Sequence, residues 1–424
     1  MDTSILSEIL IDQQRLLGED EDLIPRDIDL EKAARSKEII VISGIRRCGK
    51  SSLLRLISRR DDRSKVFVDF SDIRFSSFDI DDYRKLDKCI LELFGEVDLY
   101  LLDEVQNVPM WQRWVNGIHS RGKKVFVTGS NSNLLSSEIS TYLTGRNRVI
   151  SLSTFSFNEY LRYKGKSVKD PDHIGTKEKV GLLKLFNEFS ISGGFPEVVG
   201  QSDVSLARYY FDDIITRDIV ARFGIREVGQ LKELALFLVS NAGSPLSYKK
   251  LKAYTGIKSL STIKSYMDHL EESYLFSRVK RFSYSLKKQQ AYPSKLYAGD
   301  VGFITSTAFR FSDDSGHRLE NSVYNHLKGS GCDVYYHFSR KECDFILKEG
   351  KGITCAIQVC ENFSKGMTRD REIEGLLDAL EEYGLVSGTI ITRDHEEEIT
   401  MDDRTINVVP AWKWFLKLEI SSGS

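Results

Sequence analysis

The sequence predicts an α/β protein that begins with a doubly wound parallel sheet. Five short apolar β-type runs alternate with helical patterns over residues 1–153, and a glycine-rich loop joins the first run to a helix. Ligands of such sheets bind at the carboxyl ends of the strands. The predicted strands occupy residues 39–42, 65–72, 97–108, 123–132 and 148–152, and helices are predicted at 4–17, 79–94 and 111–119.

The length and composition predict several domains in one soluble chain. With 424 residues, 41% of them hydrophobic and 29% charged, the chain is too long for one core and has an ordinary globular composition. A net charge of −2 gives no global attraction for nucleic acid, so any such surface must be local. No apolar run reaches the ~18 residues of a membrane helix, no signal-peptide pattern is present, and the six cysteines lack zinc-site spacing. We therefore expect a cytoplasmic protein with reduced thiols and no membrane partner.

The glycine-rich loop, GIRRCGKS, has the form G-x-x-x-x-G-K-[ST] between a predicted strand and a predicted helix. Gly44 and Gly49 allow backbone N–H groups to turn toward phosphate oxygens, and the helix that follows presents its positive N-terminus to the same anion. We expect Lys50 to reach the β- and γ-phosphates and the Ser51 hydroxyl to bind Mg²⁺. The pattern therefore predicts a site for ATP and Mg²⁺. Its expected nucleotide-binding residues are Gly44, Ile45, Arg46, Arg47, Cys48, Gly49, Lys50, Ser51 and Ser52.

An acidic pair, Asp103 and Glu104, follows the third predicted strand, in the position called Walker B. We expect Asp103 to hold Mg²⁺, mostly through water, and Glu104 to polarise the attacking water. Ser130 and Asn131 end the next strand, where a polar side chain could orient that water against the γ-phosphate. Asn131 is slightly favoured over Ser130, and an ordinary turn is the alternative.

Five motifs in order resemble the archaeal and bacterial AAA+ ATPases that carry a C-terminal PD-(D/E)XK-like domain: GIRRCGKSS, LLDEVQNVPMW, VTGSNSNLL, LTGRNRVISLSTFSFNEY and GGFPEVV. The resemblance covers nearly the whole chain. It implies the roles just given to the loop and the acidic pair, and it implies a homo-oligomer such as a hexameric ring. It also implies that Arg146 supplies positive charge to a γ-phosphate, which can belong to a neighbouring subunit.

Two further domains are predicted in the middle of the chain. The resemblance implies a helical lid at 154–225, and three helical patterns followed by two β segments predict a winged helix-turn-helix at 226–305, with 261–270 as its recognition helix. Residues 245–297 contain eleven Lys and Arg against three acids, which favours DNA as a partner. A protein-interaction module is the alternative.

The last predicted domain, 306–424, is a second α/β domain whose order of helices and strands resembles a PD-(D/E)XK nuclease core, that is, a restriction-endonuclease-like fold. In such cores a helix acid, a strand acid and an acid-x-lysine pair hold Mg²⁺ and activate water. The resemblance implies that Glu320, Asp344 and Gln358 occupy the corresponding positions.

The chain departs from that pattern at the acid-x-lysine pair, because Gln358 and Cys360 stand in place of the acid and the lysine. An amide oxygen can bind Mg²⁺ but adds no charge, and a thiol cannot replace the ammonium. We therefore expect a degenerate site without cleavage activity, unless Lys348 or Lys365 supplies the missing lysine.

Together these patterns predict an Mg²⁺-dependent AAA+ ATPase that acts on DNA through a winged helix and carries an inactive nuclease-like domain. Two alternatives remain open at this point. The first is an ATP-gated DNA nuclease, and the second is a nucleotide-dependent switch that scaffolds partners. Glu104 favours turnover over a switch, because a switch needs only binding.

Overall fold

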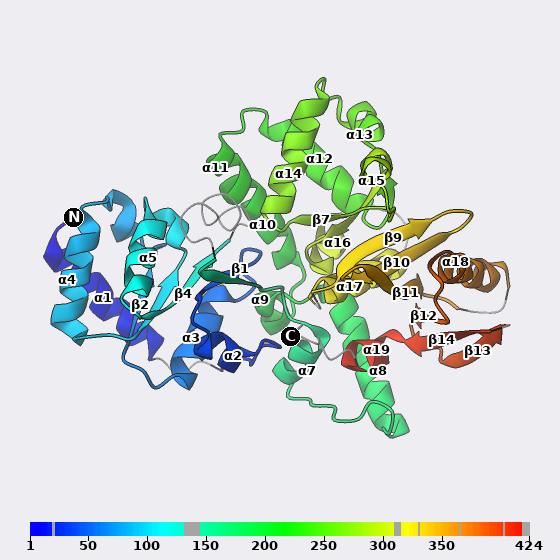
Figure 1. Cartoon of the computed structure of the whole chain (residues 1–424), viewed down its shortest axis with the longest axis horizontal. Coiled ribbons are helices and arrows are strands. Elements are labelled where there is room, and N and C mark those ends of the chain that lie inside the picture. Colours follow the sequence, from blue (N-terminus) through cyan, green and yellow to red (C-terminus); the bar gives the residue numbers. More distant parts are fainter. Residues whose placement is uncertain are drawn as a thin grey trace. The chain divides into compact units, whose positions relative to one another are not determined.

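The computed structural model describes residues 1–18, 22–130, 145–308, 315–329, 331–363, 366–401 and 403–417 of the chain (Figure 1). The chain divides into two compact units, Met1–Leu152 and Ser153–Ser424, which are described one at a time. The three domains that the sequence predicts after residue 153 all lie in the second unit.

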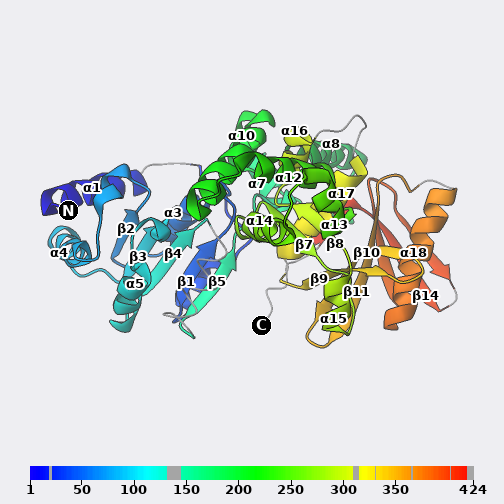
Figure 2. The same ribbon diagram turned by 90° about the horizontal axis from the view of Figure 1, so that it is seen from above.

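The first unit is built on a five-stranded parallel sheet with the strand order β2-β3-β4-β1-β5, visible as a row in Figure 2. The predicted parallel α/β sheet is thus confirmed. Its strands are β1 (Ile39–Ser43), β2 (Lys65–Asp69), β3 (Leu99–Asp103), β4 (Lys124–Gly129) and β5 (Asn147–Ser151). Its helices are α1 (Thr3–Leu17), α2 (Leu30–Arg35), α3 (Lys50–Arg60), α4 (Asp82–Phe94) and α5 (Trp111–Ser120), with short 3₁₀ turns at Ile73–Ser77 and Val105–Asn107.

Helices cover both faces of this sheet. Alternate apolar residues of β1 to β4 form one core with α1, α4 and α5, while α3 packs against β3 and β4 on the other face. The central strands are buried on both sides, which is why they read as continuous apolar runs rather than as an alternating pattern. The arrangement leaves the carboxyl ends of the strands for the loops that follow them.

Helix α1 belongs to the first unit, as the amphipathic pattern at 4–17 predicts. Leu6, Ile9 and Leu10 are fully buried in the core. The side-chain amide of Gln13 donates to the carbonyl of Asp69 at 2.9 Å and accepts from its N–H at 2.9 Å. These two bonds attach the helix to the end of β2.

The second unit begins with helices that pack around a buried carboxylate. They are α7 (Phe157–Tyr163), α8 (Thr176–Ser192), α9 (Pro196–Gln201), α10 (Ser205–Asp213), a π-helical segment (Ile214–Val220), α11 (Ala221–Phe223) and α16 (Val301–Thr307). Asp300 accepts hydrogen bonds from the Thr154 hydroxyl at 2.6 Å and from the Gly194 N–H at 2.9 Å. A Cβ on Gly193 would lie 1.8 Å from Asp300, and one on Gly194 would lie 2.3 Å from the Phe155 carbonyl. The GGFP motif therefore permits this close approach.

Three helices and a small antiparallel sheet follow. They are α12 (Val228–Ser240), α13 (Tyr248–Thr255) and α14 (Leu260–Glu272), with β6 (Pro245–Leu246), β7 (Phe276–Val279) and β8 (Ser294–Ala298) in the order β6-β8-β7. The three helical patterns and two β segments are found where the sequence places them. A short helix, α15 (Leu286–Ala291), lies between β7 and β8 and was not predicted.

The rest of the second unit contains a six-stranded mixed sheet with the order β13-β14-β12-β11-β10-β9. The strands are β9 (Asp333–Phe338), β10 (Glu342–Glu349), β11 (Gly352–Cys360), β12 (Ser387–Thr392), β13 (Glu397–Met401) and β14 (Arg404–Pro410), and the helices are α17 (Ser315–Gly329), α18 (Met367–Tyr383) and α19 (Ala411–Lys417). Helix α18 packs on β10, β11 and β12 (Figure 1). The edge strand β13 was not predicted.

Candidate functional site

The loop between β1 and α3 has a backbone shape that only glycine allows at two points. A Cβ on Gly44 would lie 2.0 Å from the carbonyl oxygen of Leu152, so this position admits no side chain. Gly49, immediately before α3, has a φ of 98°, which is in the left-handed region. Arg26 supports the loop from outside, because its guanidinium donates to the carbonyl of Cys48 at 2.9 Å. Sequence analysis did not identify Arg26, and no local pattern marks it.

Lys50, the first residue of α3, points back into this loop. Its side chain is only 4% exposed, and its ammonium donates to the carbonyls of Gly44 at 3.2 Å and Ile45 at 3.4 Å. The ammonium also lies 3.6 Å from a carboxylate oxygen of Glu104. The lysine is therefore positioned where an anion held by the loop would meet its charge.

Asp103 ends β3 beside the same loop and is buried. Its carboxylate accepts hydrogen bonds from the hydroxyls of Ser51 and Thr128. Burial raises the pKa of Asp103 to about 6, and the neighbouring Glu104 carboxylate acts in the same direction, while the two hydroxyls oppose the shift. The structure thus brings the two predicted Mg²⁺ ligands, Ser51 and Asp103, into direct contact.

Glu104 follows with a left-handed backbone (φ 47°, ψ 47°), an uncommon conformation for this residue type. Its N–H donates to the Thr128 hydroxyl at 3.0 Å, and its carboxylate accepts a bond from the Gln106 amide. Thr128 therefore connects both acids of the pair, a role that sequence analysis missed. The available signal was a single hydroxyl residue directly after the apolar run Val125–Val127 of β4.

Other predicted site residues lie elsewhere. Arg146 precedes β5 at the amino edge of the sheet, where the next residue, Asn147, pairs with Ile39 at the start of β1. Its guanidinium donates to the side-chain oxygen of Asn116 at 2.9 Å. The phosphate loop follows the opposite, carboxyl end of β1. Arg146 therefore does not reach the loop of its own chain. Ser130 is buried just after β4, and Asn131 lies outside the described residues.

The remaining loop residues differ in exposure. Ile45 and Cys48 are buried, Arg46 and Ser52 are half-buried, and Arg47 is exposed with a φ of 67°. Burial raises the pKa of the Cys48 thiol, which disfavours the reactive thiolate.

The residues present fit a nucleotide-bound Mg²⁺ rather than a metal held by protein alone. Among the described residues, no group of three or more His, Cys, Asp and Glu side chains is arranged to hold a metal ion. Mg²⁺ at a nucleotide site takes one or two protein oxygens and fills its other positions with phosphates and water. The contacting hydroxyl of Ser51 and carboxylate of Asp103 are such a pair.

A second carboxylate cluster lies in the second unit, where Glu320 of α17 and Asp344 of β10 converge on one ammonium. Lys295 of β8 lies 3.0 Å from Glu320, 2.9 Å from Asp344 and 2.8 Å from Glu342. The Tyr297 hydroxyl donates to Glu320 at 2.7 Å. Burial raises the pKa of Glu320 to about 7, and Asp344 adds to the shift while Lys295 opposes it.

Gln358 joins this cluster, although not as an open ligand. Its amide oxygen accepts from the Asp344 N–H at 3.1 Å, and its amide nitrogen donates to Glu372. Lys348, the alternative source of the missing lysine, does not lie in this cluster. Its ammonium donates to the Gly350 carbonyl at 2.7 Å at the other end of β10. Lys365 lies outside the described residues.

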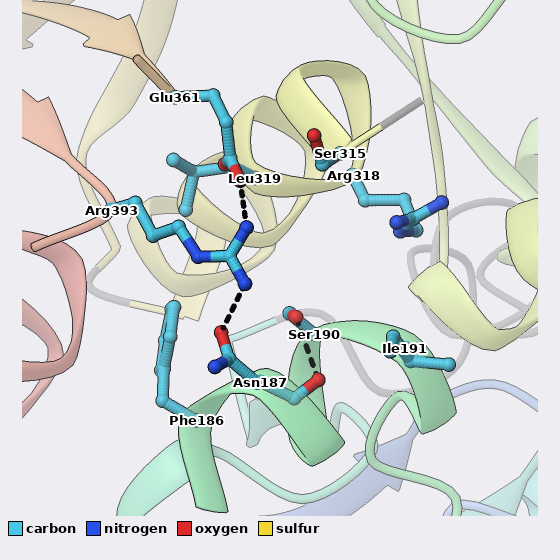
Figure 3. Close-up of a pocket in the computed structure, with 9 residues that line it drawn as sticks. All are labelled: Phe186, Asn187, Ser190, Ile191, Ser315, Arg318, Leu319, Glu361 and Arg393. Carbon is cyan, nitrogen blue, oxygen red and sulfur yellow. Dashed lines mark hydrogen bonds and ion pairs between the residues drawn. The ribbon is translucent and has the colours of Figure 1, made fainter. Parts of the chain in front are cut away.

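A small cavity in the second unit is lined by side chains of α8 and α17 and by two residues that follow strands β11 and β12 (Figure 3). Arg393 crosses it, donating to Glu361 at 2.9 Å and to Asn187 at 3.2 Å. Figure 3 shows Arg318 directed away from Arg393. Because the guanidinium of Arg393 is already paired, the cavity is a weaker candidate site than either carboxylate centre.

Comparison with known proteins identifies related sequences. Residues 36–161 match the model of an AAA domain, and residues 183–314 match a domain of unknown function (DUF8612). The chain is 33% identical to the uncharacterized protein MJ1544 of Methanocaldococcus jannaschii, over 98% of this chain and 96% of the relative. It is 29% identical to an uncharacterized protein of Haemophilus influenzae, over 93% of this chain and 99% of the relative.

Among solved structures, the Holliday junction branch migration motor RuvB of Thermotoga maritima aligns with 14% identity and a TM-score of 0.30, covering 68% of this chain and 99% of that one. AMPPCP-bound DnaA of Aquifex aeolicus aligns with 14% identity and a TM-score of 0.26, covering 57% of this chain and 84% of that one. Both TM-scores are low, so the fold assignment does not rest on these structures. It rests on the observed sheet and on the sequence matches. No helix among the described residues has both the length and the apolar character that crossing a membrane requires.

Proposed function

We propose, from the premise that this chain belongs to the same family as the Methanocaldococcus jannaschii protein MJ1544 and carries an AAA domain, that its first unit binds ATP with Mg²⁺ and hydrolyses it. One observation carries the proposal. A loop with a left-handed glycine, a buried lysine and two consecutive acids at the end of β3 meet at the carboxyl edge of one parallel sheet. The meeting residues are Lys50, Ser51, Asp103 and Glu104.

Each residue has a distinct task in this proposal. The loop N–H groups and the N-terminus of α3 hold the phosphates, and the Lys50 ammonium leaves the loop carbonyls to pair with β- and γ-phosphate oxygens. Ser51 and Asp103 hold Mg²⁺, which when bound neutralises phosphate charge. Glu104 lies at the exposed rim of the site, 22% exposed, where its carboxylate orients and polarises the attacking water.

Substitution of Lys50 tests the proposal. We expect Lys50→Ala to abolish steady-state phosphate release and to weaken ATP binding at least tenfold, because the substitution removes the buried ammonium that lies against the loop carbonyls. Lys88→Ala, at an exposed lysine of α4, is the matched control and should leave both quantities unchanged. Unchanged ATP binding and turnover in Lys50→Ala would refute the proposal.

We further propose that Arg146 acts on the nucleotide of a neighbouring subunit in a homo-oligomer. Its place at the amino edge of the sheet keeps it from its own phosphate loop, which leaves a neighbour's site as the one it can serve. In that arrangement a mixture of Arg146→Ala and Lys50→Ala proteins contains some interfaces with an intact Lys50 and an intact Arg146. Each variant alone should be inactive and the mixture should regain measurable ATPase activity. An inactive mixture of assembled subunits would contradict the arrangement.

A second proposed function is contact with DNA by the surface around α13, α14 and the β7–β8 connection, taken as a winged helix. Arg278 is neutralised by Asp268 and Glu271, and Lys295 is buried, so neither adds to an exposed positive surface. Eight lysines of the segment remain exposed, and Tyr284 and Leu286 of the wing are also exposed. The exposed lysines are Lys249, Lys250, Lys252, Lys258, Lys264, Lys280, Lys287 and Lys288.

Anisotropy titration of duplex DNA tests this surface. Exposed lysines bind phosphate through counter-ion release, so affinity should fall steeply between ~50 and ~200 mM salt. The double variant Lys287→Ala/Lys288→Ala should weaken binding and lower the salt dependence, and Lys88→Ala should do neither. Absence of binding at the lower salt concentration would favour the alternative of a protein-interaction module.

A further inference from the structure

The carboxylate cluster of the second unit encloses a cation that belongs to the chain itself, the ammonium of Lys295. The ammonium of Lys295 lies within 3.0 Å of three carboxylates that come from two different elements, α17 and β10. Lys295 is 1% exposed, although lysine is among the side chains least often buried. A buried lysine retains its charge only where acids compensate the loss of hydration, and this cluster supplies three of them.

The remaining polar atoms of the cluster are also engaged. Asp344 accepts from the Val359 N–H at 3.0 Å through its second carboxylate oxygen, and Glu320 accepts from the Tyr297 hydroxyl at 2.7 Å. Gln358 is bonded at both ends, to Asp344 and to Glu372. A divalent cation needs carboxylate oxygens of this kind at ~2.0–2.6 Å, and the ammonium lies among the oxygens such an ion would use.

We propose that the Lys295 ammonium is the permanent cation of this cluster, in the place that a divalent metal would take, so that the cluster holds no catalytic metal and the lysine instead fastens β8 to α17 and β10. The chain thus lacks the acid-x-lysine pair, and the lysine found beside the remaining acids comes from β8. Its role is structural. The ammonium cannot bring in an activated water as a metal ion does, because three carboxylates already surround it. On this proposal the cluster does not serve a metal-dependent nuclease.

Metal binding by a lysine variant tests this inference. All proteins carry Asp103→Asn, which removes the acid of the first unit, and no nucleotide is added. Mn²⁺ binding is measured by electron paramagnetic resonance, and thermal unfolding is measured with Mn²⁺ and with EDTA. With Lys295 present we expect no bound Mn²⁺ and no change in Tm. In Lys295→Met, the three carboxylates lose their cation, so we expect one bound Mn²⁺ and a Tm several degrees higher than in EDTA.

Adding Asp344→Asn to Lys295→Met is the control that assigns the bound ion, and it should remove both the Mn²⁺ signal and the rise in Tm. Mn²⁺ bound to the protein that retains Lys295, and lost with Asp344→Asn, would overturn the proposal. So would a folded Lys295→Met protein that binds no Mn²⁺.

A third measurement does not depend on the folding of Lys295→Met. With Lys295 present, Asp344→Asn should lower the Tm equally in Mn²⁺ and in EDTA, because the substitution removes a partner of the ammonium. A loss of stability seen only with Mn²⁺ would indicate a metal ligand and contradict the proposal. Cleavage of plasmid DNA by the Lys295 protein with Mn²⁺, abolished by Asp344→Asn, would contradict it as well.

Discussion

Each unit contains a buried lysine beside acids, but the two lysines differ in how fully the surrounding acids compensate their charge. In the first unit the Lys50 ammonium is bonded to loop carbonyls at 3.2 and 3.4 Å and stands 3.6 Å from Glu104. In the second unit the Lys295 ammonium lies 2.8 to 3.0 Å from each of three carboxylates. The bonds of the Lys50 ammonium are long, so a phosphate can replace them. The charge of the Lys295 ammonium is already compensated by three carboxylates of the chain.

The difference shows that a lysine near acids does not by itself identify a catalytic site. The two centres differ in the groups that are available to bind a ligand. The loop around Lys50 offers backbone donors, a helix N-terminus and an acid at the exposed rim. Around Lys295 the neighbouring amide, hydroxyl and backbone groups are paired with one another. The predictions below test this contrast, from the largest expected effect to the smallest.

Glu104→Gln should produce the largest effect. The amide keeps the shape of the side chain but cannot polarise the attacking water as a carboxylate does, so kcat for ATP hydrolysis should fall about 10³-fold with ATP binding retained. Single-turnover phosphate release together with ATP binding measures both effects. Gln106→Ala, which removes a partner of Glu104 and leaves the carboxylate, is the comparison variant. Equal, measurable turnover in wild type and Glu104→Gln would show that Glu104 does not activate the water, and negligible turnover in both would favour the switch.

The two lysines should differ in their contributions to stability. Lys295→Met leaves buried acids without a cation and should lower the free energy of unfolding by about 3–5 kcal/mol. Lys50→Met breaks longer bonds to carbonyls beside an acid that water can reach, and should cost about 1–2 kcal/mol. Denaturant unfolding in EDTA without nucleotide compares them. Equal losses would remove the proposed contrast between a complete and an incomplete centre.

The first unit could be predicted from the sequence because its signals are local. Continuous apolar runs mark strands buried on both faces, and the loop motif lies between a strand and a helix. Short elements with weak patterns were missed. Helix α15 contributes no buried residue, and the edge strand β13 is largely exposed, so neither shows a clear apolar periodicity.

The missed site residues depend on contacts between distant parts of the chain. Thr128 meets Asp103 because β4 lies beside β3, whereas Lys295 of β8 and Asp344 of β10 belong to different sheets and meet through their buried side chains. The position of Arg146 relative to the loop follows from the register of β5 on β1. None of these facts has a signature at fixed sequence spacing, and the register of a strand follows from the packed sheet.

Asp103→Asn should change the pH dependence of stability. The pKa of Asp103 is raised from the ordinary 3.8 to about 6, so the stability that its protonated form contributes is present at low pH and is lost as pH rises through about 6. Asparagine removes this loss. The variant should therefore exceed wild type by about 2–3 kcal/mol at neutral pH, with the gain shrinking toward pH 4, while its Mg²⁺-dependent activity is lost.

Unfolding free energy as a function of pH, measured in EDTA without nucleotide, checks this prediction. Asp62→Asn, at an exposed position just after α3, is the matched control and should follow wild type at every pH. A variant that loses stability at neutral pH would mean that the Asp103 carboxylate is held by bonds stronger than its burial penalty.

Thr128→Val should have the smallest effect on kcat, because valine retains the volume of the buried side chain and removes only the hydroxyl. That hydroxyl donates to the Asp103 carboxylate and accepts from the Glu104 N–H at 3.0 Å. Losing both bonds leaves a buried acceptor and a backbone donor unpaired, so we expect a cost of about 1–3 kcal/mol in unfolding free energy. Because both acids shift when the bridge is lost, kcat should also fall about tenfold. Thr128→Ser retains the hydroxyl and should stay near wild type in kcat, so equal kcat values for the valine and serine variants would show that the bridge does not position the acids.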